Sequence, residues 1–228
     1  STTATVGATD TSGLNADTVQ SSDADVASGT ARDVTVNGLP AGAQLAEGTY
    51  TGAYGTITVD ADGKATYTQT GLYDHTGVGS GTDAKTGADS ITIKVELADG
   101  TTVEVTVGVD IADDVPSISV DTPATGAYGS EITGSVDMAF GADGEKSVTV
   151  KLGNETVTGT KGADGNYTFT FADGTVLTLN GSNGDFSYNG LPASGSDTSY
   201  DFTFTVTDND GDSASASTTA TVGATDTS

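Results

Sequence analysis

Apolar and polar residues alternate along several stretches of the chain, a pattern typical of strands with one buried and one solvated face. The clearest alternation covers residues 91–97, turns at Asp99 and Gly100, and returns over residues 103–111. An Asp-Gly pair between two such runs favours a β-hairpin. A second hairpin is predicted for residues 54–67 around the turn at Asp60–Gly63.

Shorter alternating runs predict the remaining strands, and no stretch has a helical repeat of apolar positions. Residues 13–33 have weak periodicity, so strands are expected there but their bounds are not defined. Residues 72–89 are expected to form a polar loop. The other expected strands cover residues 34–36, 116–120, 132–140, 148–152, 167–171, 176–179, 186–188, 202–206 and 217–222.

The hairpins recur, which indicates an internal duplication. Residues 57–67 parallel residues 177–188, and residues 91–100 parallel residues 202–211 at an offset of 202 − 91 = 111. Pro116 interrupts the alternation between the two copies of the duplicated segment, because proline cannot donate a hydrogen bond to a strand ladder. The predicted fold is all-β, with two immunoglobulin-like β-sandwich domains in tandem, end to end, over residues 13–113 and 114–228.

The two ends of the chain carry the same twelve residues. Residues 217–228 repeat residues 1–12 letter for letter, at an offset of 217 − 1 = 216. Such identity is expected when one period is taken from a longer tandem array. We therefore expect residues 1–12 to be a partial last strand and linker of a preceding repeat. The expected partners are neighbouring repeats of the same polypeptide, in a monomeric chain.

Charge excludes some functions and suggests a cation. The chain has 32 acidic and 7 basic side chains and a net charge of −25, which would repel nucleic acid and anionic membranes. Only six acids are Glu, so 32 − 6 = 26 are Asp, the acid favoured in turns and in calcium sites. Cysteine is absent, which excludes disulfides, and no apolar run of about 18 residues predicts membrane insertion. The acidity also raises the alternative of a disordered chain, which the regular alternation opposes.

The densest carboxylate cluster is Asp208-Asn-Asp210-Gly-Asp212. Three carboxylates in five residues repel one another unless a cation neutralises them, so a Ca²⁺ site is predicted. The alternative is a solvated hairpin turn. The loop is not an EF-hand, because its Gly occupies the fourth position and not the sixth.

A second group of candidates lies at the boundary between the expected domains. Asp113 and Asp114 directly follow the last predicted strand of the first domain, and Asp110 lies a few residues earlier. We expect a Ca²⁺ ion to bridge them to a neighbouring turn, that of Asp99 or of Asp143, and so stiffen the joint. The alternative is a solvated linker stiffened by proline. Asp226 is the corresponding candidate at the far end.

Catalysis is not expected. His75 is the only histidine of the chain, it falls in the polar loop, and no Gly-x-Ser-x-Gly nucleophile motif accompanies it.

Four short motifs, in this order, resemble the tandem repeats of giant RTX adhesins, type I-secreted proteins with VCBS-type or bacterial immunoglobulin-like repeats. The motifs are Leu-Tyr-Asp-His at 72–75, Ile-Ala-Asp-Asp-Val-Pro at 111–116, Phe-Gly-Ala-Asp-Gly at 140–144 and Phe-Thr-Phe-Thr-Val-Thr-Asp-Asn-Asp-Gly-Asp at 202–212. The resemblance implies a secreted, calcium-stabilised extender on a bacterial cell surface, projecting a ligand-binding region for adhesion and biofilm formation. The first domain departs from it by lacking a Gly-Ala-Asp-Gly turn.

An adhesin module that itself binds glycan, protein or ice through a sandwich face is the alternative function. It rests on the alternating Thr156, Thr158 and Thr160 and on the Ser/Thr-rich residues 213–221. Threonine is also simply favoured on exposed strands.

Overall fold

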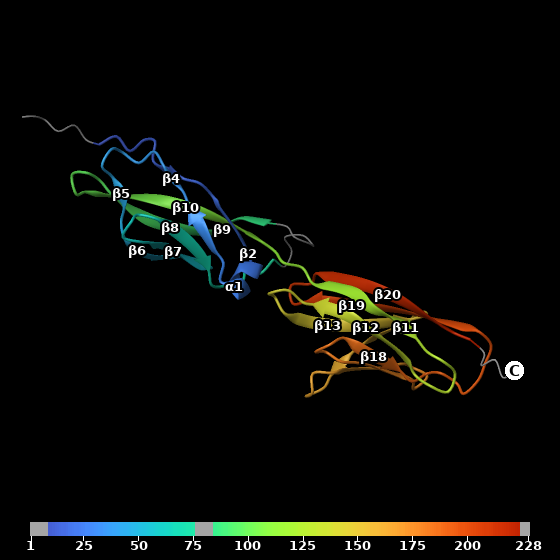
Figure 1. The fold of residues 1–228 in the computed structure, drawn as a ribbon. Coiled ribbons are helices and arrows are strands. Elements are labelled where there is room, and N and C mark those ends of the chain that lie inside the picture. Colours follow the sequence, from blue (N-terminus) through green and yellow to red (C-terminus); the bar gives the residue numbers. More distant parts are fainter. Residues whose placement is uncertain (1–8, 76–83, 224–228) are drawn as a thin grey trace, which may run out of the picture. The chain divides into compact units, whose positions relative to one another are not determined.

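The computed structural model describes residues 9–75 and 84–223 (Figure 1). These residues contain twenty strands and a single five-residue helix, so the expected all-β class is confirmed. The chain divides into two compact units, residues 1–114 (unit 1) and 115–228 (unit 2). Within the described ranges, no helix is long and apolar enough to span a membrane.

Unit 1 is a sandwich of two four-stranded sheets, with strand orders β2-β10-β9-β5 and β3-β8-β7-β6 and a small additional pair β1-β4. All pairings are antiparallel except that of β2 with β10, which is parallel. The elements are β1 (Asn15–Ala16), β2 (Val19–Ser22), α1 (Ala24–Ser28), β3 (Ala31–Val34), β4 (Val36–Asn37), β5 (Gln44–Leu45), β6 (Gly48–Thr51), β7 (Gly55–Val59), β8 (Ala65–Gln69), β9 (Ala84–Glu96) and β10 (Thr102–Ala112).

The core of unit 1 is built by the alternation seen in the sequence. Ile93 of β9 and Val107 of β10 are fully buried, and they belong to one apolar cluster with Ile57 and Tyr67 of the facing sheet. Burying an aliphatic side chain of this size contributes roughly 1.5–3 kcal/mol. The turn between β9 and β10 contains Gly100 at φ 81°, a conformation that glycine adopts without steric cost.

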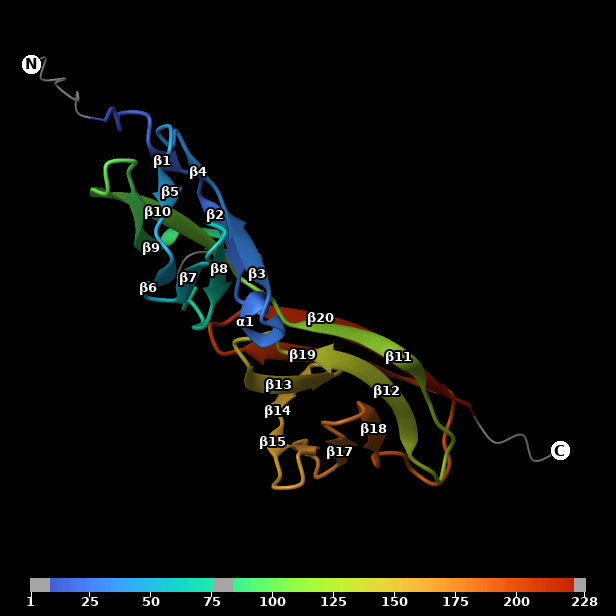
Figure 2. The same cartoon turned by 60° about the vertical axis from the view of Figure 1, so that its left-hand side comes forward.

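Unit 2 is also a two-sheet sandwich, with strand orders β11-β12-β18-β17-β16-β15 and β14-β13-β19-β20 (Figure 2). The described elements are β11 (Ser117–Thr125), β12 (Ile132–Ala139), β13 (Glu145–Leu152), β14 (Glu155–Thr158), β15 (Thr160–Lys161), β16 (Tyr167–Thr170), β17 (Val176–Leu179), β18 (Asp185–Tyr188), β19 (Thr198–Asp208) and β20 (Ser213–Val222).

Aromatic side chains fill the core of unit 2. The ring centroids of Phe186 and Phe204 lie 4.9 Å apart, and Phe202 packs edge-on against Tyr188 at 5.5 Å. Phe202 and Phe204 extend inward from β19, while Phe186 and Tyr188 come from β18 in the other sheet. These contacts join the two sheets of unit 2.

Strand pairing repeats between the units. In unit 1, β9 pairs with β10 and β5, as β19 pairs with β20 and β13 in unit 2. The hairpin β7-β8 pairs onward with β3, as β17-β18 pairs with β12. The segments that parallel one another in the sequence therefore occupy equivalent places in the two topologies.

The sequence was least informative for residues 13–33. Here the structure has the helix α1 and the strand β2, whose pairing with β10 is the parallel one. Helix α1 ends at Ser28 and is capped by Gly29, whose N–H donates to the Asp25 carbonyl over 2.8 Å. Five residues are too few to display a helical period, which explains why the sequence did not predict the helix.

Phe204→Ala should destabilise unit 2 by about 3–5 kcal/mol, because it leaves a cavity where Phe204 contacts the opposite sheet. Thr203→Ala, which changes a half-buried neighbour on the outer face of β19, is the control and should cost about 1 kcal/mol or less. Chemical denaturation followed by tyrosine fluorescence measures both. Equal losses for the two variants would contradict the sandwich packing.

Candidate metal centre

Two carboxylates emerge side by side where the parallel strands β2 and β10 end. The register pairs Ser22 with Ala112 at the ends of the two strands. The residues that follow, Asp23 and Asp113, therefore leave the sheet side by side. The Asp23 N–H donates to the Ala112 carbonyl over 3.0 Å. Both carboxylates are buried, with Asp23 0% and Asp113 4% exposed.

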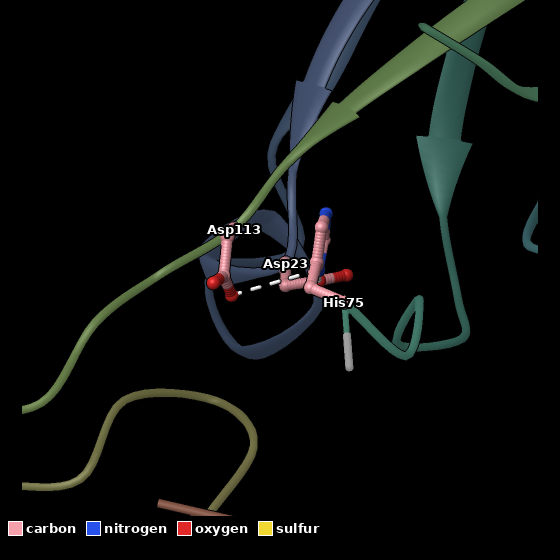
Figure 3. A group of neighbouring side chains, drawn as sticks. All are labelled: Asp23, His75 and Asp113. Atoms are coloured by element: carbon pink, nitrogen blue, oxygen red, sulfur yellow. Dashed lines mark ion pairs between the residues drawn. The ribbon is translucent and has the colours of Figure 1, made fainter. Parts of the chain in front are cut away.

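The imidazole of His75 lies between these two carboxylates (Figure 3). Its Nδ1 is 3.1 Å from Asp23 Oδ2 and 3.5 Å from Asp113 Oδ1. Its Nε2 is 3.1 Å from the Ile111 carbonyl oxygen. One ligand atom from each of the three side chains lies within 4.8 Å of the others. We call Asp23, His75 and Asp113 the histidine cluster.

Hydrogen bonds fix the orientation of Asp23. Its Oδ1 accepts from Gln69 Nε2 at 2.6 Å and from the Tyr73 N–H at 2.9 Å. Ser21 Oγ donates to Gln69 Oε1 at 2.7 Å and so holds that amide. Burial raises the pKa of Asp23, although the Tyr73 N–H and the neighbouring His75 oppose the rise. Asp23 Oδ2 is thereby left facing His75.

The next carboxylate, Asp25, has a separate partner. Arg32 donates to it twice, from Nε to Oδ2 at 2.9 Å and from Nη2 to Oδ1 at 2.7 Å. Burial opposes ionisation of Asp25, but the hydrogen bonds from Arg32 and from the Ser22 N–H outweigh it and lower the pKa of Asp25. A bidentate arginine pair fixes a carboxylate firmly, so Asp25 anchors α1 beside the histidine cluster.

Asp89 is buried too, but protein groups satisfy it. Its carboxylate accepts from the N–H groups of Ala53, Tyr54 and Ser90 at 2.8–3.0 Å. The Tyr67 hydroxyl lies 3.4 Å away, and burial followed by the charge of Asp89 raises the pKa of Tyr67. Asp89 therefore tethers the loop before β7 and needs no cation.

In unit 2, the predicted loop from Asp208 to Asp212 closes the β19-β20 hairpin. The Asp208 N–H donates to the Asp212 carbonyl, and Asp208 Oδ1 accepts from the N–H groups of Gly211 at 3.1 Å and Asp212 at 2.7 Å. Asp208 is fully buried and Asp212 is 7% exposed. A fully solvated turn, the alternative, does not describe these two side chains.

The second carboxylate oxygen of Asp208 is the unusual atom of this loop. Asp208 Oδ2 is buried and has no hydrogen-bond partner among the described residues. Burial raises the pKa of Asp208 to about 6, and the neighbouring Asp210 carboxylate contributes to the rise. One carboxylate oxygen each of Asp210 and Asp212 lie within 4.8 Å of each other. The loop thus concentrates negative charge around a buried acceptor.

The Asp143 turn lies against this loop. Asn209 Nδ2 donates to the Asp143 carbonyl oxygen over 2.6 Å, which joins the turn between β12 and β13 to the turn between β19 and β20. Two of the carboxylate-bearing turns predicted as cation ligands are therefore neighbours within unit 2.

Two of the predicted ligands, Asp99 and Asp110, have partners away from Asp113. Asp99 lies in the turn before β10 and Asp113 follows the end of that strand, so the eleven residues of β10, roughly 35 Å, separate them. Asp99 instead accepts from the Thr101 N–H and hydroxyl within its own turn. Asp110 accepts from the Gly87 N–H at 2.8 Å and from Gln20 at 3.0 Å, at the bulge where β9 slips against β10. Asp110 stabilises that bulge.

The remaining predicted ligands have mixed outcomes. Asp113 and Asp114 stay close, with one carboxylate oxygen of each within 4.8 Å. Asp226 lies outside the described residues.

The sequence did not identify Asp23 or His75 as site residues. His75 was placed in a polar loop, yet it is 2% exposed. Asp23 comes from the segment whose strands were predicted only in outline. Asp23 and Asp113 are 90 positions apart, and the parallel pairing of β2 with β10 brings them together, while His75 reaches them from the segment after β8. Within the described residues, no serine or threonine hydroxyl hydrogen-bonds to His75, so the geometry of a Ser-His-Asp triad is not formed there.

No family model and no curated protein matches the chain. Solved structures with a similar arrangement include Drosophila N-cadherin EC1-3, which is 10% identical, covers 91% of this chain and has a TM-score of 0.39. Mouse cadherin-23 EC22-24 is 13% identical over 92% of this chain with a TM-score of 0.33, and DIP-gamma IG1+IG2 is 8% identical over 92% with a TM-score of 0.31. The chain spans 63% and 64% of the two cadherin chains and 98% of DIP-gamma. At these identities the likeness concerns the fold alone.

In chelator, ionisation of the buried Asp208 carboxyl should lower the stability of unit 2 as the pH rises. Its folded pKa of about 6 exceeds the ordinary 3.8, so its stabilising contribution is complete below about pH 4 and is lost as the pH passes 6. Thermal melts in chelator between pH 4.5 and 7.5 should show a falling midpoint for unit 2 and a shallower fall for Asp208→Asn. Asp137→Asn, an exposed acid in β12, should keep the wild-type slope. Identical slopes for wild type and Asp208→Asn would contradict the assignment.

Proposed function

We propose that this chain is a non-catalytic, calcium-stabilised extender of a large, secreted bacterial adhesin, in which neighbouring repeats of the same polypeptide are its partners. The proposal combines the resemblance of the sequence motifs to RTX adhesin repeats with the two β-sandwich units. It also assigns the acidic loops a physical role.

The observation that carries the proposal is the loop Asp208–Asp212, in which Asp208 and Asp212 are buried. Three carboxylates and a buried oxygen without a hydrogen-bond partner cannot all be ionised there without a large cost. Calcium takes six to eight oxygen ligands from carboxylates, carbonyls and water. The loop supplies ligands of this class, since it offers the carboxylates of Asp208, Asp210 and Asp212. A bound Ca²⁺ would neutralise the repulsion and stabilise the hairpin.

The charge of the whole chain supports the same role. With 32 acidic against 7 basic side chains, self-repulsion opposes the compact state. Cation binding to the folded form alone stabilises it by mass action. A chain of this kind would be soft where calcium is scarce, and it would become stiff outside the cell, where calcium is abundant. Asp113 and Asp114 are the second proposed calcium group.

Calcium should raise the thermal midpoint of unit 2. At a free Ca²⁺ concentration of one hundred times the Kd, the stabilisation is about 2.7 kcal/mol, which corresponds to roughly 10 °C or more for a domain of this size. Scanning calorimetry with 5 mM CaCl₂ or with chelator measures the shift. Asp208→Asn and Asp212→Asn should reduce it, while Asp137→Asn, with the same change of charge at an exposed position, should not.

An unchanged midpoint in calcium, together with unchanged dimensions in small-angle scattering, would refute the extender proposal. Isothermal titration calorimetry of the full chain gives the number of Ca²⁺ ions bound and shows which variants lose one.

A groove on unit 2 favours a second candidate function, that of a ligand-binding adhesin module. Its volume is about 840 Å³, and exposed hydroxyl groups of Thr133, Thr168 and Thr178 line it, together with the amides of Asn166 and Asn180. Such donors and acceptors suit a polyhydroxylated ligand such as a glycan. The one tyrosine of the groove, Tyr167, is 1% exposed, so a sugar would be held by hydrogen bonds and not by stacking on its face.

If the groove binds a glycan, a glycan array should give a signal that Thr168→Lys abolishes without changing the thermal midpoint. Ser213→Lys places the same charge on the other sheet, outside the groove, and should keep the signal. An array without signal for the wild-type chain, or a signal that survives Thr168→Lys, would remove this candidate.

A further inference from the structure

The tautomer of His75 follows from its hydrogen bond to the backbone. Nε2 lies 3.1 Å from the carbonyl oxygen of Ile111. A carbonyl oxygen only accepts hydrogen bonds, so Nε2 must carry a proton. In the neutral imidazole the lone pair is then on Nδ1, since the hydrogen bond of one ring nitrogen decides the state of the other.

Nδ1 is directed at two carboxylates. It is 3.1 Å from Asp23 Oδ2 and 3.5 Å from Asp113 Oδ1. The side chains of His75 and Asp23 are 1% and 0% exposed, and neither Nδ1 nor Asp23 Oδ2 has a hydrogen-bond partner among the described residues. A lone pair that faces carboxylate oxygens in a buried site is repulsive. Either a proton on Nδ1 or a metal ion between these atoms would remove this repulsion.

We propose that the histidine cluster binds a divalent transition-metal ion of the zinc class, through Nδ1 of His75, Oδ2 of Asp23 and Oδ1 of Asp113. Calcium prefers oxygen ligands only, whereas imidazole together with carboxylate suits zinc and its neighbours in the series. The ligands of a tetrahedral zinc ion, at about 2.0–2.1 Å from the metal, lie roughly 3.3 Å from one another. The observed separations of 3.1 and 3.5 Å are on either side of that value.

The surroundings of the cluster orient the ligands as the second shell of a metal site does. A metal-binding histidine commonly donates its other N–H to a backbone carbonyl, and here Ile111 provides that carbonyl. Asp23 Oδ1 is held by Gln69 and by the Tyr73 N–H, which leaves Oδ2 for the ion. Two carboxylates and a neutral imidazole carry a net charge of −2, which a divalent ion neutralises.

The competing explanation is a proton. An imidazolium would donate from Nδ1 to the carboxylates and would need no metal. The geometry opposes it, because Nδ1 and Asp23 Oδ2 are close without forming a hydrogen bond. Asp113 is shared with the second proposed calcium group, but the metal proposal does not rest on calcium binding, because its ligand set includes an imidazole and the main calcium loop, Asp208–Asp212, belongs to unit 2.

A single histidine makes the test direct, because its imidazole nitrogens give the only histidine ¹⁵N signals of the chain. The full chain, without a histidine tag, is titrated with ZnCl₂ in calorimetry and in ¹⁵N NMR. We expect one Zn²⁺ to bind tightly, with Nε2 protonated and Nδ1 metal-bound between pH 6 and 8. His75→Gln and Asp23→Asn should each weaken this binding at least tenfold, and Asp62→Asn, at an exposed turn of unit 1, should not.

Zinc binding by the wild-type chain that is no tighter than by His75→Gln would overturn the proposal. So would the ¹⁵N signal of a doubly protonated imidazolium that persists in excess Zn²⁺, or Zn²⁺ binding that does no more than displace bound Ca²⁺. Calorimetry with CaCl₂ on His75→Gln separates the two proposals, because calcium binding at the Asp208 loop should be unchanged. If His75→Gln does not fold, the wild-type ¹⁵N signals and Asp23→Asn decide the question.

Discussion

The structure depends on how buried carboxylates are neutralised in a chain with very few cationic side chains. Ion pairs with lysine or arginine join Arg32 to Asp25, Lys64 to Asp33 and Lys161 to Glu145. Backbone N–H groups neutralise others, as at Asp89. Asp208 Oδ2 and, in the histidine cluster, Asp23 Oδ2 are different, because these two buried oxygens have no hydrogen-bond donor among the described residues. Both sites lie where strands of a sheet end, because there the chain can turn carboxylates inward without breaking a ladder.

The fold could be predicted from the sequence wherever the alternation was long. The hairpins at β7-β8 and β9-β10, and the duplication that relates β9 to β19, follow from period-two patterns and Asp-Gly turns, which are local properties. The short segment that holds β2 and α1 could not be predicted, because two or four strand residues and a single helical turn show no period. Its structure is decided by pairing with β10, a strand about ninety residues away.

The candidate sites divide in the same way. The Asp208–Asp212 loop was visible because its carboxylates are adjacent in the sequence, although only the structure shows that Asp208 is buried. The sequence could not show that Asp99 and Asp113 lie at opposite ends of β10, because proximity to a domain boundary gives no information about which end of a strand a residue occupies. The polar residues around His75 in the sequence predicted an exposed loop position for it. Its burial arises among Asp23, Asp113 and the Ile111 carbonyl, which lie in β10 or directly after β2 and β10, far from His75 in the sequence.

The parallel pairing of β2 with β10 also has a consequence for assembly. The three side chains of the histidine cluster come from the beginning, the middle and the last residues of unit 1, so the cluster is complete only after the whole unit has been made and its final strand has docked. Contacts this distant in sequence are formed late and slowly. A cation held there would therefore bind only the completely folded unit. It would stabilise a completed repeat and leave a partly folded one unstabilised.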